Sequence, residues 1–232
     1  MGEMIAVSAP DALQAETPSA SDVANAYLAT PAPGSAKGRA LVVLQEYFGL
    51  VHHIKDVADR FAAQGYTALA PDLYHGRAAE TPDEATKLLM SMDLARTERD
   101  LAGSVEHLRA LTGHKVGIVG FCVGGALSLF AACENGERIG ACVVYYGGNR
   151  RVTYAIDRLQ APVLGHWAED DAFANASRDK VEGELRRFGK PYEFHTYPGT
   201  KHAFFNDERP NFDPAAAALS WTRTLAFFDR TL

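Results

Sequence analysis

From Arg39 to the C-terminus, short apolar runs alternate with segments of helical periodicity. The apolar runs are 41–44, 66–70, 115–121, 139–146, 162–167 and 192–197. They are apolar almost throughout, in place of strict alternation, which is typical of strands buried on both faces. Strands that alternate with helices along a chain form a mostly parallel sheet covered by helices on both faces. The sequence therefore predicts an α/β fold.

The chain has 232 residues and no internal repeat or composition shift, so we expect one domain spanning 1–232. Residues 1–22 are expected to be a less regular N-terminal edge segment. Two edge strands are predicted at 3–7 and 23–30, with a polar loop between them. In the last helix, one stripe that we expect to pack on the sheet carries Trp221, Leu225, Phe228 and Leu232.

Charge and cysteine content exclude several classes of protein. The 23 basic and 29 acidic residues give a formal net charge of −6, which argues against a nucleic-acid partner. Three cysteines are too few for a disulfide framework and favour a reducing, cytoplasmic location. No run approaches the roughly 18 apolar residues of a membrane span, and the N-terminus does not resemble a secretory signal. We expect a monomer or homodimer that acts on small molecules.

The segment Gly120-Phe121-Cys122-Val123-Gly124 joins a predicted strand to a predicted helix. A nucleophile on such a sharp turn sits in strained backbone geometry and needs small neighbours two residues to either side. Cys122 has glycine at both positions, whereas Cys133 and Cys142 do not. The alternative is a buried structural thiol, but the strand before and the helix after favour a nucleophile.

A reactive thiol needs a base, and the base needs an orienting acid. In folds with this turn, the acid and then the base follow the nucleophile along the chain. Acidic residues follow the run 162–167, at the carboxyl end of a strand, where open α/β sheets place their sites. Asp171 is the preferred acid, with Asp170 as the alternative because spacing alone does not separate neighbours.

His202 is the predicted base. It follows the next predicted strand, on a loop that begins at Pro198. The other histidines either lie within predicted strands or precede Cys122: His52, His53, His75, His107, His114, His166 and His195.

Two backbone N–H groups are expected to bind the oxyanion of a tetrahedral intermediate. The residue after the nucleophile, Val123, supplies one. The loop after the first predicted buried strand supplies the other, which we assign to Tyr47. This chemistry requires no metal or organic cofactor.

These residues resemble the dienelactone hydrolases of the α/β-hydrolase fold, and the likeness extends from about Val23 to the C-terminus. The matching stretches are 45–50, 71–74, 120–125, 145–147, 168–173 and 197–202. The resemblance implies a Cys122-Asp171-His202 triad and favours Asp171 over Asp170.

The resemblance also implies that Glu46 contacts the resting thiol and takes part in its activation. A carboxylate beside a thiol disfavours the thiolate, so the sulfur would stay protected until Glu46 moves. The alternative is that Glu46 pairs with a cation such as Arg77.

The sequence departs from the family beyond the catalytic histidine. Chlorocatechol-pathway members use arginines to hold a substrate carboxylate, one of them just after that histidine. Here residues 203–206 are Ala-Phe-Phe-Asn, and the next arginine is Arg209. A less charged lactone or ester is therefore expected. Residues that could line the pocket, or merely pack, are Tyr74, Arg77, Tyr145, Trp167 and Phe173.

The sequence thus predicts a hydrolase that opens a lactone or small ester through a thioester acyl-enzyme. Two alternatives keep the fold and change the function. One is a non-catalytic binding protein on a hydrolase scaffold. The other is a redox-responsive thiol protein, in which Cys122 would pair with Cys133 or Cys142.

Overall fold

The computed structural model describes residues 2–8, 23–148 and 151–232, in two units, Met1–Val116 and Gly117–Leu232. The strands of the first unit are β1 (Glu3–Ser8), β2 (Val23–Ala29), β3 (Arg39–Leu44) and β4 (Tyr66–Pro71). They lie in the order β1-β2-β4-β3, with β3 and β4 parallel and both β1 and β2 antiparallel to their neighbours. The predicted edge strands are confirmed, while the loop predicted between them falls on residues 9–22, outside the described part of the chain.

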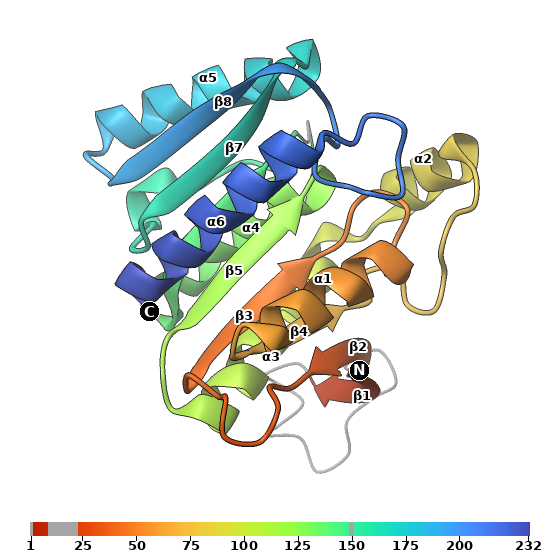
Figure 1. Ribbon diagram of the computed structural model, residues 1–232, viewed down its shortest axis with the longest axis vertical. Helices are drawn as coiled ribbons and strands as arrows, with labels where there is room; N and C mark the ends of the chain where they lie inside the picture. The colour runs from red at the N-terminus through yellow and green to blue at the C-terminus, as the bar shows by residue number, and fades with distance from the viewer. Residues whose placement is uncertain (1, 9–22, 149–150) are drawn as a thin grey trace. The chain divides into compact units, whose positions relative to one another are not determined.

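The helices of the first unit are α1 (His52–Ala63), α2 (Pro82–Ser91) and α3 (Leu94–Thr112). Figure 1 shows α1 in front of β3 and β4, with α3 behind them. Helix α3 ends where Gly113 adopts the left-handed conformation, with φ of 73°. Helix α2 begins with a capping box in which Thr81 and Glu84 bond each other's backbone N–H groups.

The second unit contains β6 (Ile139–Tyr145), β7 (Val163–Asp170) and β8 (Tyr192–Lys201), all parallel, and β5 (Val116–Phe121) beside β6. Two short 3₁₀ turns, η3 (Gly136–Arg138) and η4 (Ile156–Arg158), precede β6 and β7. Side chains of β5 and β6 are almost entirely buried, as their continuous apolar character predicts.

The long helices of the second unit are α4 (Val123–Asn135), α5 (Ala172–Arg187) and α6 (Pro214–Thr231). Both α4 and α6 contact β6, and Figure 1 shows α6 in front of the strands and α4 behind. Helix α5 packs on β7.

The stripe predicted for the last helix is only partly correct. Phe228 is buried, but Trp221, Leu225 and Leu232 are only half-buried. The face that packs on the sheet is centred instead on Ser220, Thr224 and Phe227. Polar Thr224 is buried because its hydroxyl bonds the Tyr145 hydroxyl, at 2.8 Å, and the His166 ring, at 3.0 Å.

Strands β7 and β8 are longer than the sequence predicts. They extend through Asp170 and Lys201, and these two residues are paired across the ladder. The register shifts between Ala168 and Asp170, which indicates a β-bulge. Pro198 is accommodated in β8 because this is an edge strand, where a missing N–H leaves no inner ladder bond unmade. The extension places both residue 171 and residue 202 directly after paired strand ends.

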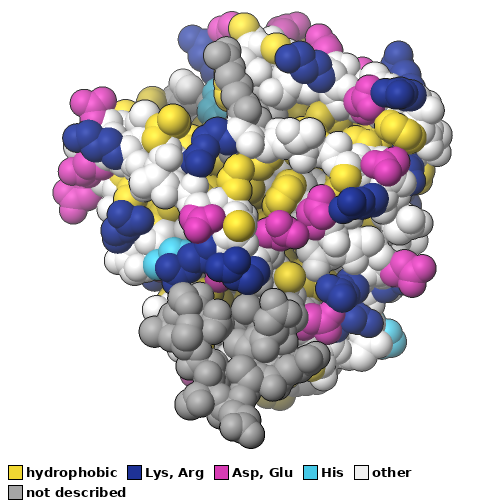
Figure 2. Space-filling model, turned by 180° about the vertical axis from the view of Figure 1, so that it is seen from behind, with side chains coloured by type: hydrophobic (Ala, Val, Ile, Leu, Met, Phe, Trp, Pro, Cys, Tyr) yellow, Lys and Arg dark blue, Asp and Glu magenta, His cyan; other side chains and the backbone are white. Residues whose placement is uncertain are grey.

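The predicted fold class, a mostly parallel α/β arrangement with helices on both faces, is confirmed. That 1–232 forms a single domain stays a prediction. Among the described residues, no helix has the length and apolar character needed to cross a bilayer. Figure 2 shows acidic and basic side chains interspersed over the visible surface.

Candidate active site

Cys122 lies on a sharp turn between β5 and α4, with φ of 56° and ψ of −119°. An L-residue other than glycine rarely adopts positive φ, and such strain concentrates at functional positions. The Cys122 N–H donates to the carbonyl of Tyr145, at 3.1 Å, and its own carbonyl accepts from the Gly125 N–H, at 3.0 Å. The thiol is half-buried. The chain thus holds this sulfur at the amino end of a helix.

Close packing around the turn leaves no room for a side chain at Gly120 or Gly125. A Cβ on Gly120 would overlap the carbonyl of Gly124, and a Cβ on Gly125 would come within 2.8 Å of the Tyr145 carbonyl oxygen. Real Cβ atoms do not approach backbone atoms this closely. The strand and helix can meet at Cys122 only because these positions carry no side chain.

Val123 is the first residue of α4, and it is almost completely buried. N–H groups in the first turn of a helix have no partner within the helix. The N–H of Val123 is therefore oriented along the amino end of α4, where the helix dipole favours negative charge.

Asp171 combines two roles at the start of α5. One carboxylate oxygen, Oδ1, accepts from the Ala174 N–H at 3.1 Å and caps the helix. The other, Oδ2, lies 2.5 Å from Nδ1 of His202. Asp171 is buried, whereas its neighbour Asp170 is exposed. Of the two acids that spacing left open, the structure brings Asp171 to His202.

The turn that carries His202 is attached to its surroundings at several points. Before it, the N–H of Gly199 donates to Oε2 of Glu169, at 2.8 Å. After it, Nδ2 of Asn211 donates to the His202 carbonyl, at 3.0 Å. The imidazole lies against the ring of Tyr146, with centroids 5.1 Å apart. These contacts restrict the positions the imidazole can take.

The pKa of His202 is raised from its usual 6.5 to about 10. Burial lowers this pKa, but hydrogen bonds to Asp171 and Cys122, together with electrostatic interactions with both groups, raise it by more. His202 therefore holds its proton throughout the neutral range. An imidazolium in contact with a sulfur stabilises the thiolate, the reactive form of cysteine.

This raised pKa predicts a dependence of stability on pH. Because the folded pKa exceeds the unfolded value, His202 contributes full stability below about pH 6.5, and the contribution is lost as pH rises towards about 10. Urea unfolding at pH 6, 8 and 10 should show the free-energy difference between wild type and His202→Gln shrinking as pH rises. A difference that stays constant or grows would contradict the assignment.

In the first unit, Glu46 and Tyr47 follow β3 as predicted. Glu46 is 4% exposed, and its carbonyl accepts from the Gly49 N–H at 3.2 Å, which forms a tight turn. Gly49 has φ of 101°, a value that suits glycine. The catalytic contact of Glu46 and the oxyanion contact of Tyr47 stay predictions.

Tyr74 and Arg77, in the same unit, differ in their exposure to solvent. Tyr74 is buried, and its hydroxyl donates to the Tyr47 carbonyl at 3.1 Å, so it supports the loop that carries Tyr47. Arg77 is exposed, and its Nε donates to the Tyr74 carbonyl at 3.3 Å.

In the second unit, two of the residues predicted to line a pocket are interior side chains. Tyr145 is fully buried with its hydroxyl on Thr224, and Trp167 is 2% exposed. Phe173 is 45% exposed, at the start of α5. Their contact with substrate stays a prediction, and of the three only Phe173 has a ring accessible to solvent.

Residues 203–206 contain no charged side chain, and most of them pack in the interior. Phe204, Phe205 and Asn206 are all buried. The Phe205 ring is stacked on Phe121, with centroids 5.2 Å apart. The segment that departs from the family pattern therefore contributes aromatic packing beside the strand that leads to the turn.

The remaining cysteines are free and buried. Burial raises the pKa of Cys133 to about 12, and burial also raises the pKa of Cys142. Thiols of this kind are poor nucleophiles, so the structure offers little support for disulfide exchange with Cys122. Among residues 2–8, 23–148 and 151–232, no three His, Cys, Asp or Glu side chains are arranged to hold a metal ion.

The strand-turn-helix geometry at Cys122 and the mostly parallel sheet define an α/β-hydrolase. Residues 24–232 match the model of the dienelactone hydrolase family. Protein usf of Aquifex pyrophilus is 35% identical over 217 residues, covering 89% of this chain and 93% of that protein. A protein of Aquifex aeolicus, provisionally named carboxymethylenebutenolidase, is 32% identical over 87% of this chain and 91% of its own length. The chain belongs to the dienelactone hydrolase family and is a hydrolase.

Solved structures agree with this assignment. A provisionally named dienelactone hydrolase from Klebsiella pneumoniae has a TM-score of 0.81 and 27% identity, covering 98% of this chain and 99% of that one. The fold is also that of a dienelactone hydrolase from Anabaena variabilis, with a TM-score of 0.73, 21% identity and coverage of 100% and 98%.

Proposed function

We propose that this enzyme hydrolyses a lactone or small ester through a covalent thioester on Cys122. The observation that carries the proposal is the 2.5 Å contact between Asp171 and His202, with His202 in turn hydrogen-bonded to Cys122 on its strained turn. A nucleophile, a base and an orienting acid in series are the requirement for nucleophilic acyl transfer.

In the first half of the reaction, the Cys122 thiolate attacks the carbonyl carbon and forms a C–S bond. The carbonyl π electrons move to oxygen, and the oxyanion accepts hydrogen bonds from the N–H groups of Val123 and Tyr47. When the intermediate collapses, the ester C–O bond breaks and the leaving oxygen takes the proton from His202. In a lactone, this oxygen stays attached to the acyl group.

In the second half, His202 removes a proton from water as the water attacks the thioester carbonyl. The C–S bond then breaks, Cys122 returns to the thiolate, and a carboxylic acid leaves. Asp171 keeps the imidazole in one orientation and stabilises its positive form during both halves. The raised pKa of His202 suits the first half, in which it acts as an acid.

Glu46 is proposed to adjust the state of the thiol before substrate binds. Its carboxylate is almost completely buried on the loop after β3, a position that matches the activating glutamate of the family. In contact with the sulfur, this carboxylate would oppose thiolate formation until substrate displaces it.

An ester or lactone without a nearby carboxylate is the proposed substrate class. The segment after His202, where family members carry an arginine, is filled by buried Phe204 and Phe205. Aromatic side chains packed there offer no cation to a substrate carboxylate. The cytoplasm is the proposed location.

Replacing each of the two neighbouring aspartates in turn tests which one is the catalytic acid. Asp171→Asn should lower kcat/KM for p-nitrophenyl acetate by between about 10² and 10⁴, because the amide no longer stabilises the imidazolium. The fold should persist, since an asparagine oxygen can still accept from the Ala174 N–H. Asp170→Asn is the matched control and should stay within about twofold of wild type, because Asp170 is exposed. Equal losses in both variants would refute the role of Asp171.

A further inference from the structure

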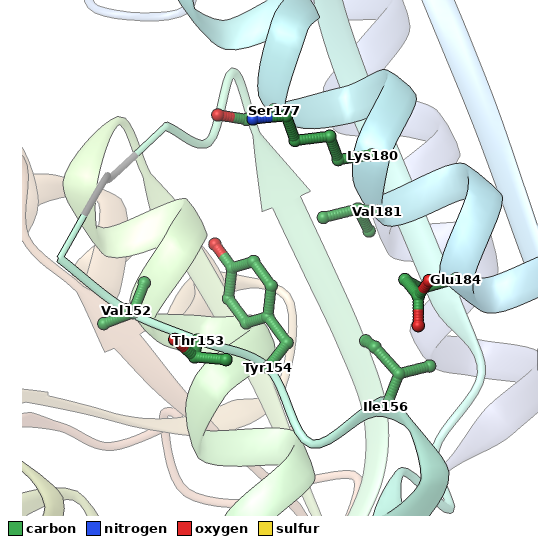
Figure 3. A pocket seen from close by; sticks show the side chains of 8 residues that line it. All are labelled: Val152, Thr153, Tyr154, Ile156, Ser177, Lys180, Val181 and Glu184. Atoms are coloured by element: carbon green, nitrogen blue, oxygen red, sulfur yellow. The ribbon is translucent and has the colours of Figure 1, made fainter.

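A pocket of about 580 Å³ opens in the second unit between α5 and the segment that ends in η4. Its walls are largely apolar, formed by Val152, Ile156, Val181 and the ring of Tyr154. Figure 3 shows the Tyr154 ring standing in the space between the two segments. The volume lies in the range of small-molecule sites, and apolar walls with few polar groups are their usual lining.

Lys180 is the cation of this pocket, and its charge is not matched by a partner. The other charged side chains of α5 form ion pairs within the helix: Arg178 with Asp179, Arg186 with Glu182, and Arg187 with Glu184. Lys180 forms no ion pair with any described residue. An ammonium at the edge of an apolar pocket favours an anionic ligand.

Two hydroxyl groups accompany Lys180. Neither Ser177 nor Tyr154 forms a side-chain hydrogen bond with another described residue, so both hydroxyls are available to a ligand. In the view of Figure 3, the Tyr154 hydroxyl points towards the end of the pocket where Ser177 and the head of Lys180 lie. Burial raises the pKa of Tyr154, so its hydroxyl stays neutral and can donate to a carboxylate.

We propose that this pocket binds an amphipathic monocarboxylate at a site separate from the catalytic triad. The carboxylate contacts Lys180 and the two hydroxyls, and the hydrocarbon chain lies along Val181 and Ile156. From Ser177 to Glu184 the helix rises about 10 Å, which matches a chain of about eight carbons. Glu184 lines the pocket at the end away from Ser177 and disfavours a second carboxylate there.

A second hollow, of about 460 Å³, shares Ser177 and Lys180 with this pocket and continues to Ala172 and Phe173. A ligand in the pocket packs on the same helix that Asp171 caps, from about two to about four turns beyond the cap. Binding at this pocket does not require a reactive sulfur and is therefore independent of the proposed hydrolysis.

Calorimetric titration with sodium octanoate tests the site. Binding should be unchanged, within about twofold, in protein whose Cys122 has been alkylated with iodoacetamide. Lys180→Met, which keeps the aliphatic stem and removes the charge, should weaken binding at least about fivefold. Lys87→Met, at an exposed position on α2, is the matched control and should bind as wild type does.

Ser177→Phe supplies an independent variant, because a ring at this half-buried position of α5 fills the space the two hollows share and should abolish binding. Circular dichroism would establish that both α5 variants are folded. The proposal is overturned if octanoate does not bind, if Lys180→Met binds it as wild type does, or if alkylation of Cys122 eliminates binding. The last result would assign octanoate to the catalytic site and leave the hydrolysis proposal intact.

Discussion

Cys122→Ala should lower kcat/KM for p-nitrophenyl acetate by a factor of about 10³ or more while leaving the fold intact. The expected loss is large because Cys122 is the proposed nucleophile, and removal of a triad nucleophile leaves only binding and oxyanion stabilisation. Folding should survive, since the Cys122 thiol is half-buried and the turn depends on backbone bonds. Mass spectrometry of wild type quenched in acid should show one acetyl group on Cys122.

Cys133→Ala is the matched control for this prediction. Cys133 is 1% exposed and has no role in the proposed chemistry, so the variant should lose some stability and keep its activity. Iodoacetamide should inactivate wild type and Cys133→Ala alike and modify Cys122. Retention of wild-type activity by Cys122→Ala would eliminate the nucleophile and favour a non-catalytic or redox role for this thiol.

Gly120→Ala should destabilise the protein by about 3 kcal/mol or more and reduce activity together with stability. The added methyl group would overlap the carbonyl of Gly124, and backbone atoms on both sides of Cys122 would have to move. Urea unfolding, monitored by circular dichroism, measures the loss. The surviving folded fraction should show a lower kcat, because the sulfur would be displaced from His202.

Gly183→Ala makes the same chemical change where space is available. Gly183 lies within α5, and a Cβ there meets nothing within 4 Å. Alanine in an exposed helix interior should stabilise the protein by about 0.5–1 kcal/mol. Changes of opposite sign in the free energy of unfolding of the two variants would establish that crowding, rather than loss of glycine flexibility, explains the result at Gly120. A neutral Gly120→Ala would mean that the turn is not sterically constrained.

Much of the site was predictable because its signals are local. Glycines on both sides of Cys122 reflect a close backbone approach, which any sequence that forms this turn must permit. The order of acid and base after the nucleophile follows from the order of the parallel strands whose ends carry them. Spacing alone did not separate Asp171 from Asp170, although the resemblance favoured Asp171. The choice between them depends on the register shift in β7, which determines the residue at which the chain leaves the sheet.

The sequence did not predict the pocket residues Tyr154, Ser177 and Lys180, because no sequence motif marks them. Each is a common residue type in a segment without a motif, and only the fold brings η4 alongside α5. The charge pattern gives no signal either, because Lys180 lies four residues before Glu184, at pairing distance, and only the structure shows that Glu184 pairs with Arg187 instead. Helix α2 was also missed, although Thr81 and Glu84 carry the spacing of a capping box.

The amino-acid sequence by itself determined the α/β class, the two edge strands and the strained turn at Cys122, because periodicity and steric demand act between residues close together in the chain. The tertiary structure brought Asp171, which the resemblance favoured, into contact with His202, and it placed Thr224 rather than Trp221 at the centre of the buried face of α6. Those outcomes depend on strand register and on hydrogen bonds between residues far apart in the chain. No local pattern encodes such pairings, because their energy arises only once the strands and helices have packed.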